Sequence, residues 1–133
     1  MFTIIVALPA ATISDVSNLD GDYVGLLFAG GSSGDELFPV SVSLSGGSGT
    51  GAQITNHDSG ALSADTVTIT LDSSVDDPSD GFIKGTIDDG VGSGDMVAMA
   101  AVNVNGSGKN FIFFIGDNPG ENGMLYNMLL ISK

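Results

Sequence analysis

The sequence predicts an all-β fold, chiefly because turn-like clusters divide it into short apolar runs. Seven clusters rich in Gly, Ser, Asn and Asp separate eight apolar or alternating runs of strand length within 133 residues. Short strands at such regular spacing are typical of a β-sandwich or a β-barrel. The acidic residues agree, since 14 are Asp and 2 are Glu, and Asp favours turns whereas Glu favours helix interiors.

The first four runs are each expected to form a strand. In the second and the fourth, apolar residues alternate with Ser or Thr, which indicates strands with one buried face. The first is an apolar run of strand length, and the third is short and weak. In chain order, these strands are expected at Tyr23 to Ala29, Glu36 to Ser45, Gly51 to Asn56 and Ala64 to Asp72.

The last four runs complete the set. The fifth places Ile83 and Ile87 on one face. The sixth opens on the helix-prone Met-Val-Ala-Met-Ala-Ala but continues into Val-Asn-Val-Asn-Gly, which favours a strand that ends in a turn. The seventh and eighth are almost wholly apolar, and a C-terminal helix is the competing interpretation of the eighth. The expected ranges are Gly81 to Asp88, Met96 to Asn105, Asn110 to Gly116 and Gly123 to Ser132.

Loop length predicts the topology. No connection is long enough for a crossover helix, so consecutive strands are expected to pair antiparallel in a meander. Eight such strands close naturally into an up-and-down barrel without exposed edges, and a β-sandwich is the main alternative. The chain length suits one domain, so we expect an N-terminal arm or residual export segment over residues 1–18 and a single barrel domain over residues 19–133.

Strands 110–116 and 123–132 are apolar on both faces, although a barrel wall with one face in water should alternate. Their outer face therefore needs a cover. The segment from Phe2 to Ile13 is one candidate, and a second copy of the chain is the other, which predicts a homo-oligomer through these two strands. Local burial inside a sandwich is the alternative.

Composition limits the partners. The chain has no Arg, three Lys and a net charge of −13, so it would repel nucleic acid and anionic membranes. It has no Cys and no apolar run of transmembrane length. The segment from Phe2 to Ala11 resembles the apolar part of a signal peptide without the basic region that precedes it. An exported location is therefore favoured.

The residues Leu19-Asp20-Gly21-Asp22-Tyr23 open the first strand of the barrel. They resemble the Gly-x-Trp opening of calycin barrels, the lipocalin and avidin-like group, with Tyr in place of Trp. The resemblance implies that Tyr23 closes one end of the barrel, with Lys109 or Lys133 over it, and that the barrel holds a small ligand. The Trp and Arg of that pattern are absent here.

We expect a non-enzymatic binding protein that holds a small apolar or amphipathic ligand inside the barrel. Such an interior needs a few polar groups among apolar walls. The ligand-binding candidates are Tyr23, Lys84, Asn103, Tyr126 and Asn127. A self-associating structural module without a ligand is the alternative.

Two acidic clusters raise the question of calcium, which prefers oxygen ligands at short spacing. One is Asp72, Asp76, Asp77 and Asp80, and the other is Asp15, Asn18, Asp20 and Asp22. Neither fits the EF-hand pattern, so solvated turns are the favoured interpretation and no cofactor is expected.

No catalytic constellation is expected either. His57 is the one His, it lies in a turn-like segment, and a Ser-His-Asp triad needs a His held by packed neighbours. The sequence therefore predicts no enzyme.

Overall fold

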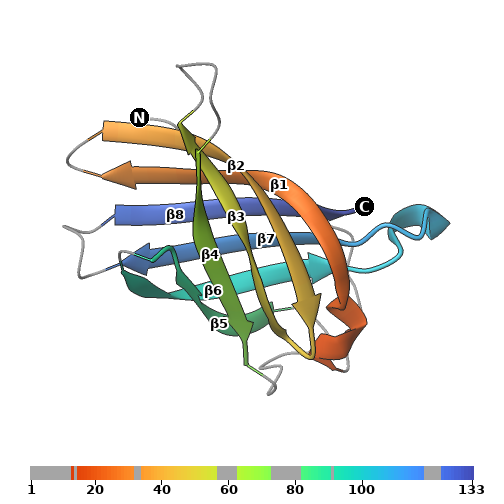
Figure 1. Ribbon diagram of the computed structural model, residues 1–133. Helices are drawn as coiled ribbons and strands as arrows, with labels where there is room; N and C mark the ends of the chain where they lie inside the picture. Colours follow the sequence, from red (N-terminus) through yellow and green to blue (C-terminus); the bar gives the residue numbers. More distant parts are fainter. Residues whose placement is uncertain are drawn as a thin grey trace.

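The computed structural model is a closed barrel in which eight strands follow one another in chain order (Figure 1). It describes residues 13, 15–31, 34–56, 63–72, 82–90, 92–118 and 124–133. Each strand pairs antiparallel with the next, and β1 pairs with β8 to close the ring. The predicted up-and-down barrel is thereby confirmed, the sandwich is excluded, and the last segment is a strand rather than a helix.

The strands are β1 (Gly21–Gly31), β2 (Gly34–Ser45), β3 (Ser48–Asn56), β4 (Ser63–Leu71), β5 (Phe82–Asp88), β6 (Ser93–Ala101), β7 (Phe111–Asn118) and β8 (Met124–Ser132). Two short 3-10 helices, η1 (Val16–Leu19) and η2 (Val104–Gly106), lie before β1 and after β6. Several strands exceed their predicted ranges because glycines that suggest turns in the sequence belong to strands. The β2–β3 connection needs only Gly46 and Gly47, both with positive φ, as tight hairpins require.

The sixth strand is shorter at its end than the sequence predicts. It stops at Ala101 instead of continuing to Asn105, because Asn103 adopts a left-handed conformation with φ 47°. Asn is one of the few non-glycine residues that tolerate this region. The Oδ1 atom of Asn103 accepts a hydrogen bond from the Gly108 N–H at 2.7 Å, so Asn103 organises the β6–β7 connection. The prediction that it lies within a strand is wrong.

The core fills the inside of the barrel. Alternate residues of every strand point inward, and the buried apolar ones form a single cluster. On β2 these are Val40, Val42 and Leu44, whereas the serines between them face outward. Burial of such side chains is the main stabilising contribution to a fold of this kind.

Inward-facing glycines bring the strands close together. A Cβ atom on Gly25 would collide with the backbone carbonyl of Leu129 on β8, and one on Gly51 would collide with that of Ser41 on β2. The missing side chains let neighbouring strands approach closely at these positions. These glycines therefore have a structural reason to lie within strands, although the sequence suggests turns.

One end of the barrel is closed by η1, and we call it the η1 end. Val16 and Leu19 are buried there. The Tyr23 hydroxyl donates a hydrogen bond to the Leu19 carbonyl at 2.7 Å. The other end, where β1, β3, β5 and β7 finish, carries the buried side chain of Gln53, and we call it the Gln53 end.

Few of the residues in the expected N-terminal arm belong to the described part of the chain. Ile13 and Val16 are buried in the core, whereas residues 1–12 and 14 lie outside the described residues. The expectation that the segment from Phe2 to Ile13 covers the outer wall stays a prediction. Among the described residues, neither helix has the length and hydropathy of a membrane-crossing segment.

Candidate functional site

The five predicted ligand-binding residues do not converge inside the barrel. Tyr23 and Tyr126 both face inward and are buried, but they lie at opposite ends. Lys84 and Asn127 lie on the outward-facing side of β5 and β8, and Asn103 lies in the β6–β7 connection. The structure therefore brings no two of the five together at one site, and only Lys84 and Asn127 share the outer wall.

The two tyrosine hydroxyls have partners within the chain. The Tyr23 hydroxyl is bonded to Leu19 and lies 3.4 Å from the Nδ2 atom of Asn110. Burial raises the pKa of Tyr23, with a smaller contribution from the nearby Asp20. The Tyr126 hydroxyl donates to the carboxylate of Asp89 at 3.1 Å. Tyr23 thus bonds to Leu19 and to Asn110, and Asn110 is next to the Lys109 that the calycin resemblance implied.

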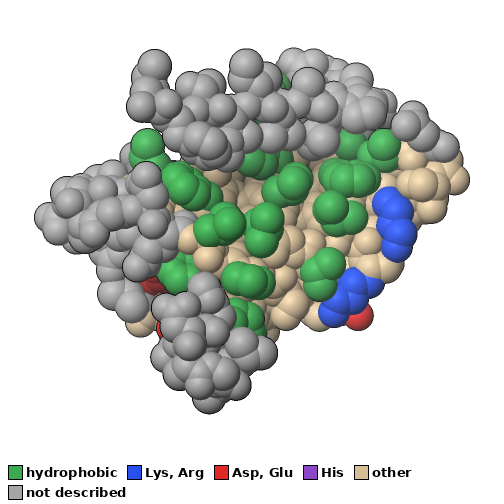
Figure 2. Space-filling model, turned by 90° about the horizontal axis from the view of Figure 1, so that it is seen from above, with side chains coloured by type: hydrophobic (Ala, Val, Ile, Leu, Met, Phe, Trp, Pro, Cys, Tyr) green, Lys and Arg blue, Asp and Glu red, His purple; other side chains and the backbone are tan. Residues whose placement is uncertain are grey.

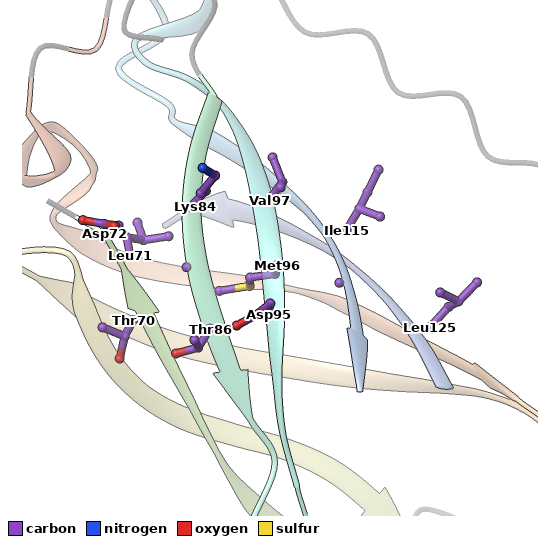
Figure 3. Close-up of a pocket in the computed structure, with 12 residues that line it drawn as sticks. Thr70, Leu71, Asp72, Lys84, Thr86, Asp95, Met96, Val97, Ile115 and Leu125 are labelled. Atoms are coloured by element: carbon purple, nitrogen blue, oxygen red, sulfur yellow. The ribbon is translucent and has the colours of Figure 1, made fainter. Parts of the chain in front are cut away.

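A groove lies on the outer wall of the described structure. Its volume is about 960 Å³, and it crosses β5 and β6 between the end of β4 and the strands β7 and β8 (Figure 3). Its lining comprises Thr70, Leu71, Asp72, Lys84, Gly85, Thr86, Asp95, Met96, Val97, Ile115, Gly116 and Leu125.

Strand register explains why the outer wall forms a groove here. Leu71, Gly85, Met96 and Gly116 are paired in one row across β4 to β7. Their side chains, where present, point into the barrel, so this row offers only backbone to the outside. Outward-facing rows stand on both sides of it and form the walls of the groove. The row of inward residues is therefore the floor.

One wall of the groove is apolar. The register pairs Lys84 with Val97, Val97 with Ile115, and Ile115 with Asn127. Val97 and Ile115 are 43% and 52% exposed, and Leu125 nearby is 56% exposed. Figure 3 shows these three side chains projecting to the same side from neighbouring strands. Lys84 and Asn127 lie at the two ends of this row. They are three strand spacings apart, which is about 14 Å.

The other wall is polar. Thr70 pairs with Thr86, and Thr86 pairs with Asp95, in a row of exposed side chains. Asp72 lies beyond the end of β4, where its N–H donates to the carbonyl of Lys84 at 2.7 Å. The groove therefore places hydroxyl and carboxylate groups opposite an apolar wall, which suits an amphipathic molecule.

The acidic clusters give no metal site in the described structure. Asp15 accepts a hydrogen bond from the Ser17 N–H at 2.8 Å, and this bond lowers the pKa of Asp15. Asp20 accepts from the Gly46 N–H at 2.7 Å, and Asp22 accepts from the hydroxyl of Ser43 at 2.5 Å. Each carboxylate thus supports local structure.

The other cluster is only partly described. Asp72 is exposed beside the groove, and Asp76, Asp77 and Asp80 lie outside the described residues, as does His57. Within the described ranges, no three His, Cys, Asp or Glu side chains are grouped as metal ligands would be.

A second apolar surface lies beyond the groove. On β1, Val24 and Leu26 are 44% and 48% exposed, and Ile131 on β8 pairs with Val24. Seen from above, hydrophobic side chains cover the middle of one face of the molecule, whereas the charged side chains that are visible lie at its edges (Figure 2). Exposed apolar patches of this kind are typical of interaction sites.

The fold and the groove define an eight-stranded antiparallel barrel with an amphipathic outer site. Neither a protein-family model, a curated protein nor a solved structure matches this chain. The likeness to calycin barrels is therefore one of general architecture.

Proposed function

We propose that this protein is a non-enzymatic binding protein that holds a small amphipathic molecule in the groove on its outer wall. The observation that carries the proposal is the division of the groove into an apolar wall of Val97, Ile115 and Leu125 and a polar wall that includes Thr86 and Asp95. Small-molecule sites are mostly apolar, with a few polar groups that fix the orientation of the ligand. A volume of about 960 Å³ falls within their usual range.

The groove is favoured over the barrel interior because of how the interior is occupied. The inward side chains of Leu27, Phe114 and Met128 are at most 2% exposed and belong to one packed cluster. A ligand among them would have to displace side chains from a closely packed core, which is costly. The outer groove needs no such rearrangement.

Binding of a neutral fluorescent probe tests this function. N-phenyl-1-naphthylamine carries no charge, so the net charge of −13 does not repel it. We expect its fluorescence to rise on binding, and we expect decanol to displace it. The variant Ile115→Asp should weaken binding at least about tenfold, because it places a charge in the apolar wall.

Leu37→Asp is the matched control for that experiment. Leu37 is 54% exposed, as Ile115 is 52% exposed, but it lies on β2 outside the groove. Its variant should bind the probe as the unmodified protein does. Equal loss of binding in both variants, or no loss in either, would contradict the groove as the binding site.

Self-association is a second candidate function, supported by the apolar surface on β1 and β8. Because the chain as a whole is strongly acidic, two copies repel one another over most of their surfaces. This face is favoured for their contact because its visible charged side chains lie at the edges (Figure 2). The predicted homo-oligomer through strands 110–116 and 123–132 would use the neighbouring wall, so β1 extends that interface.

Sedimentation velocity separates the two functions. Leu26 lies outside the groove and is 48% exposed, so Leu26→Asp should dissociate an oligomer and leave probe binding unchanged. A monomer at all protein concentrations, before any substitution, would rule out self-association.

A further inference from the structure

The charged side chains of the outer groove are unevenly distributed. Two carboxylates, Asp72 and Asp95, and one cation, Lys84, line it. Lys84 lies beside Asp72, whose N–H donates to the Lys84 carbonyl at 2.7 Å. Asp95 lies in the polar wall on β6, two residues before Val97, which is the register partner of Lys84. The lysine of the groove is therefore next to Asp72 and is not in the row of Asp95.

The carboxylate of Asp95 has no partner within the described part of the chain. Its side chain is exposed, and the described residues give it neither a hydrogen bond nor an ion pair. The chain has no Arg and three Lys. Besides Lys84, these are Lys109, which precedes β7, and Lys133, which follows β8, at the end of the barrel where β1 begins. None of the three lysines therefore belongs to the row of Asp95.

That row contains a second acidic residue. The register pairs Asp95 with Thr86 on β5 and with Asp117 on β7. Like charges at directly opposite positions of neighbouring strands destabilise a sheet. A cation bound beside Asp95 would offset this repulsion, and the chain itself supplies none there.

Apolar surface lies within reach of the same carboxylate. Asp95 and Val97 are on the same face of β6, two residues apart, so their Cα atoms are separated by about 7 Å. Val97 continues into Ile115 on β7, and the two side chains are 43% and 52% exposed. Thr86 lies beside Asp95 on the other neighbouring strand (Figure 3). One small molecule can therefore contact the carboxylate and the apolar wall together.

We propose that the ligand of the groove is a cationic amphiphile, whose charged group binds the carboxylate of Asp95 and whose apolar part lies on Val97 and Ile115. This inference rests on the function proposed for the groove and names the class of its ligand. The net charge of −13 attracts such a molecule to the protein and repels an anionic one. If the charged group is an ammonium, it can also donate to the hydroxyl of Thr86.

A metal ion fits the groove less well than an organic cation. Calcium needs six to eight oxygen ligands, and the described residues hold no group of three acidic, His or Cys side chains suited to a metal. A metal ion would also leave the apolar wall without a contact. The combination of one open carboxylate and an apolar wall therefore favours an organic cation.

Three amphiphiles with the same alkyl chain test the proposal. Decylammonium, decanol and decanoate each compete with N-phenyl-1-naphthylamine at neutral pH, below the concentrations at which they form micelles. We expect decylammonium to bind about fivefold more tightly than decanol, as an exposed ion pair allows, and decanoate to bind most weakly. Equal competition by decylammonium and decanol would overturn this proposal and leave the proposed function intact. Displacement by none of the three would overturn both.

Two variants separate the Asp95 carboxylate from the net charge. Asp95→Asn and Asp65→Asn each remove one negative charge from an exposed side chain. Asp65 is the control, because it lies near the start of β4, whereas the groove reaches only the end of that strand. We expect Asp95→Asn to weaken decylammonium binding about threefold to fivefold and to leave decanol binding unchanged.

Asp65→Asn should bind both compounds as the unmodified protein does. An equal loss of decylammonium affinity in the two variants would show attraction by net charge alone and overturn the proposal. Undiminished decylammonium binding in Asp95→Asn would overturn it as well.

Discussion

The two ends of the barrel differ in one buried polar group, which has hydrogen-bond partners at the η1 end and lacks one at the Gln53 end. At the η1 end, the hydroxyl of Tyr23 meets the carbonyl of Leu19 and the amide of Asn110. At the Gln53 end, a buried amide oxygen has no partner among the described residues. An unpaired buried group of this kind costs about 1–3 kcal/mol. The buried hydroxyl at the first end therefore has its partners, whereas the unpartnered amide oxygen at the second end costs stability.

The largest expected effect is a loss of stability from a cavity at the η1 end. Leu19→Ala removes a side chain that is 0% exposed and leaves a cavity under η1. We expect the free energy of unfolding to fall by about 3 kcal/mol in urea titrations, as for other buried Leu to Ala changes. The matched change Leu26→Ala on the outer face, where the side chain is 48% exposed, should cost less than about 1 kcal/mol. Similar losses in both variants would mean that η1 does not close the core.

The second effect has the opposite sign. Gln53→Leu replaces an unpaired buried amide with an apolar side chain of similar size, so we expect the free energy of unfolding to rise by about 1 kcal/mol. The measurement is again a urea titration. A fall in stability would mean that the amide of Gln53 is satisfied in the free protein, and the contrast between the two ends would disappear.

Removal of each inward tyrosine hydroxyl sharpens the comparison. Tyr23→Phe should cost about 1 kcal/mol, because the carbonyl of Leu19 loses its donor at a buried position. Tyr126→Phe should cost less, because the carboxylate of Asp89 keeps its bond from the Gly92 N–H. Thermal unfolding of the two variants side by side gives the order. The reverse order would place the more important hydroxyl at the Gln53 end.

The smallest effect is a dependence on alkaline pH. Burial, as the largest cause, raises the pKa of Tyr23 above its ordinary value of 10.0. Below that value both the folded and the unfolded chain keep the phenol proton. Above it the unfolded chain releases the proton first, so the free energy of unfolding falls as the pH rises. Urea titrations at about pH 8 and about pH 10.5 should show a smaller fall in Tyr23→Phe than in the unmodified protein. An equal fall in both would assign the effect to other groups.

The sequence contained enough information for the fold because its strongest signals are local. Alternation such as that of Val67 and Ile69 with threonines fixes which face of β4 is buried, and short loops require antiparallel neighbours. Closure of the barrel could be predicted because eight meander strands form a barrel without exposed edges. The end of β6 was missed because the left-handed conformation of Asn103 depends on its bond with Gly108, which no periodicity reveals.

The candidate sites could be predicted less well because they depend on register. Lys84 and Asn127 are far apart in the sequence, and they share an outer row only through the pairings of β5 to β8. Gln53 was missed because it lies in a strand that looked weak. One signal was present, since Gly49, Gly51 and Gln53 share a parity, but only the pairing of Gln53 with Val40 shows that this parity faces inward.

The inward glycines have a consequence for protein engineering. At Gly25 and Gly51 the space for a Cβ atom is already taken by a carbonyl of the next strand. The backbone itself therefore limits the internal width of the barrel there. A redesign that aims to bind a molecule inside must therefore replace large buried side chains such as Phe114 and Met128 with smaller ones. The glycine positions are closed to it, because even alanine there would push two strands apart.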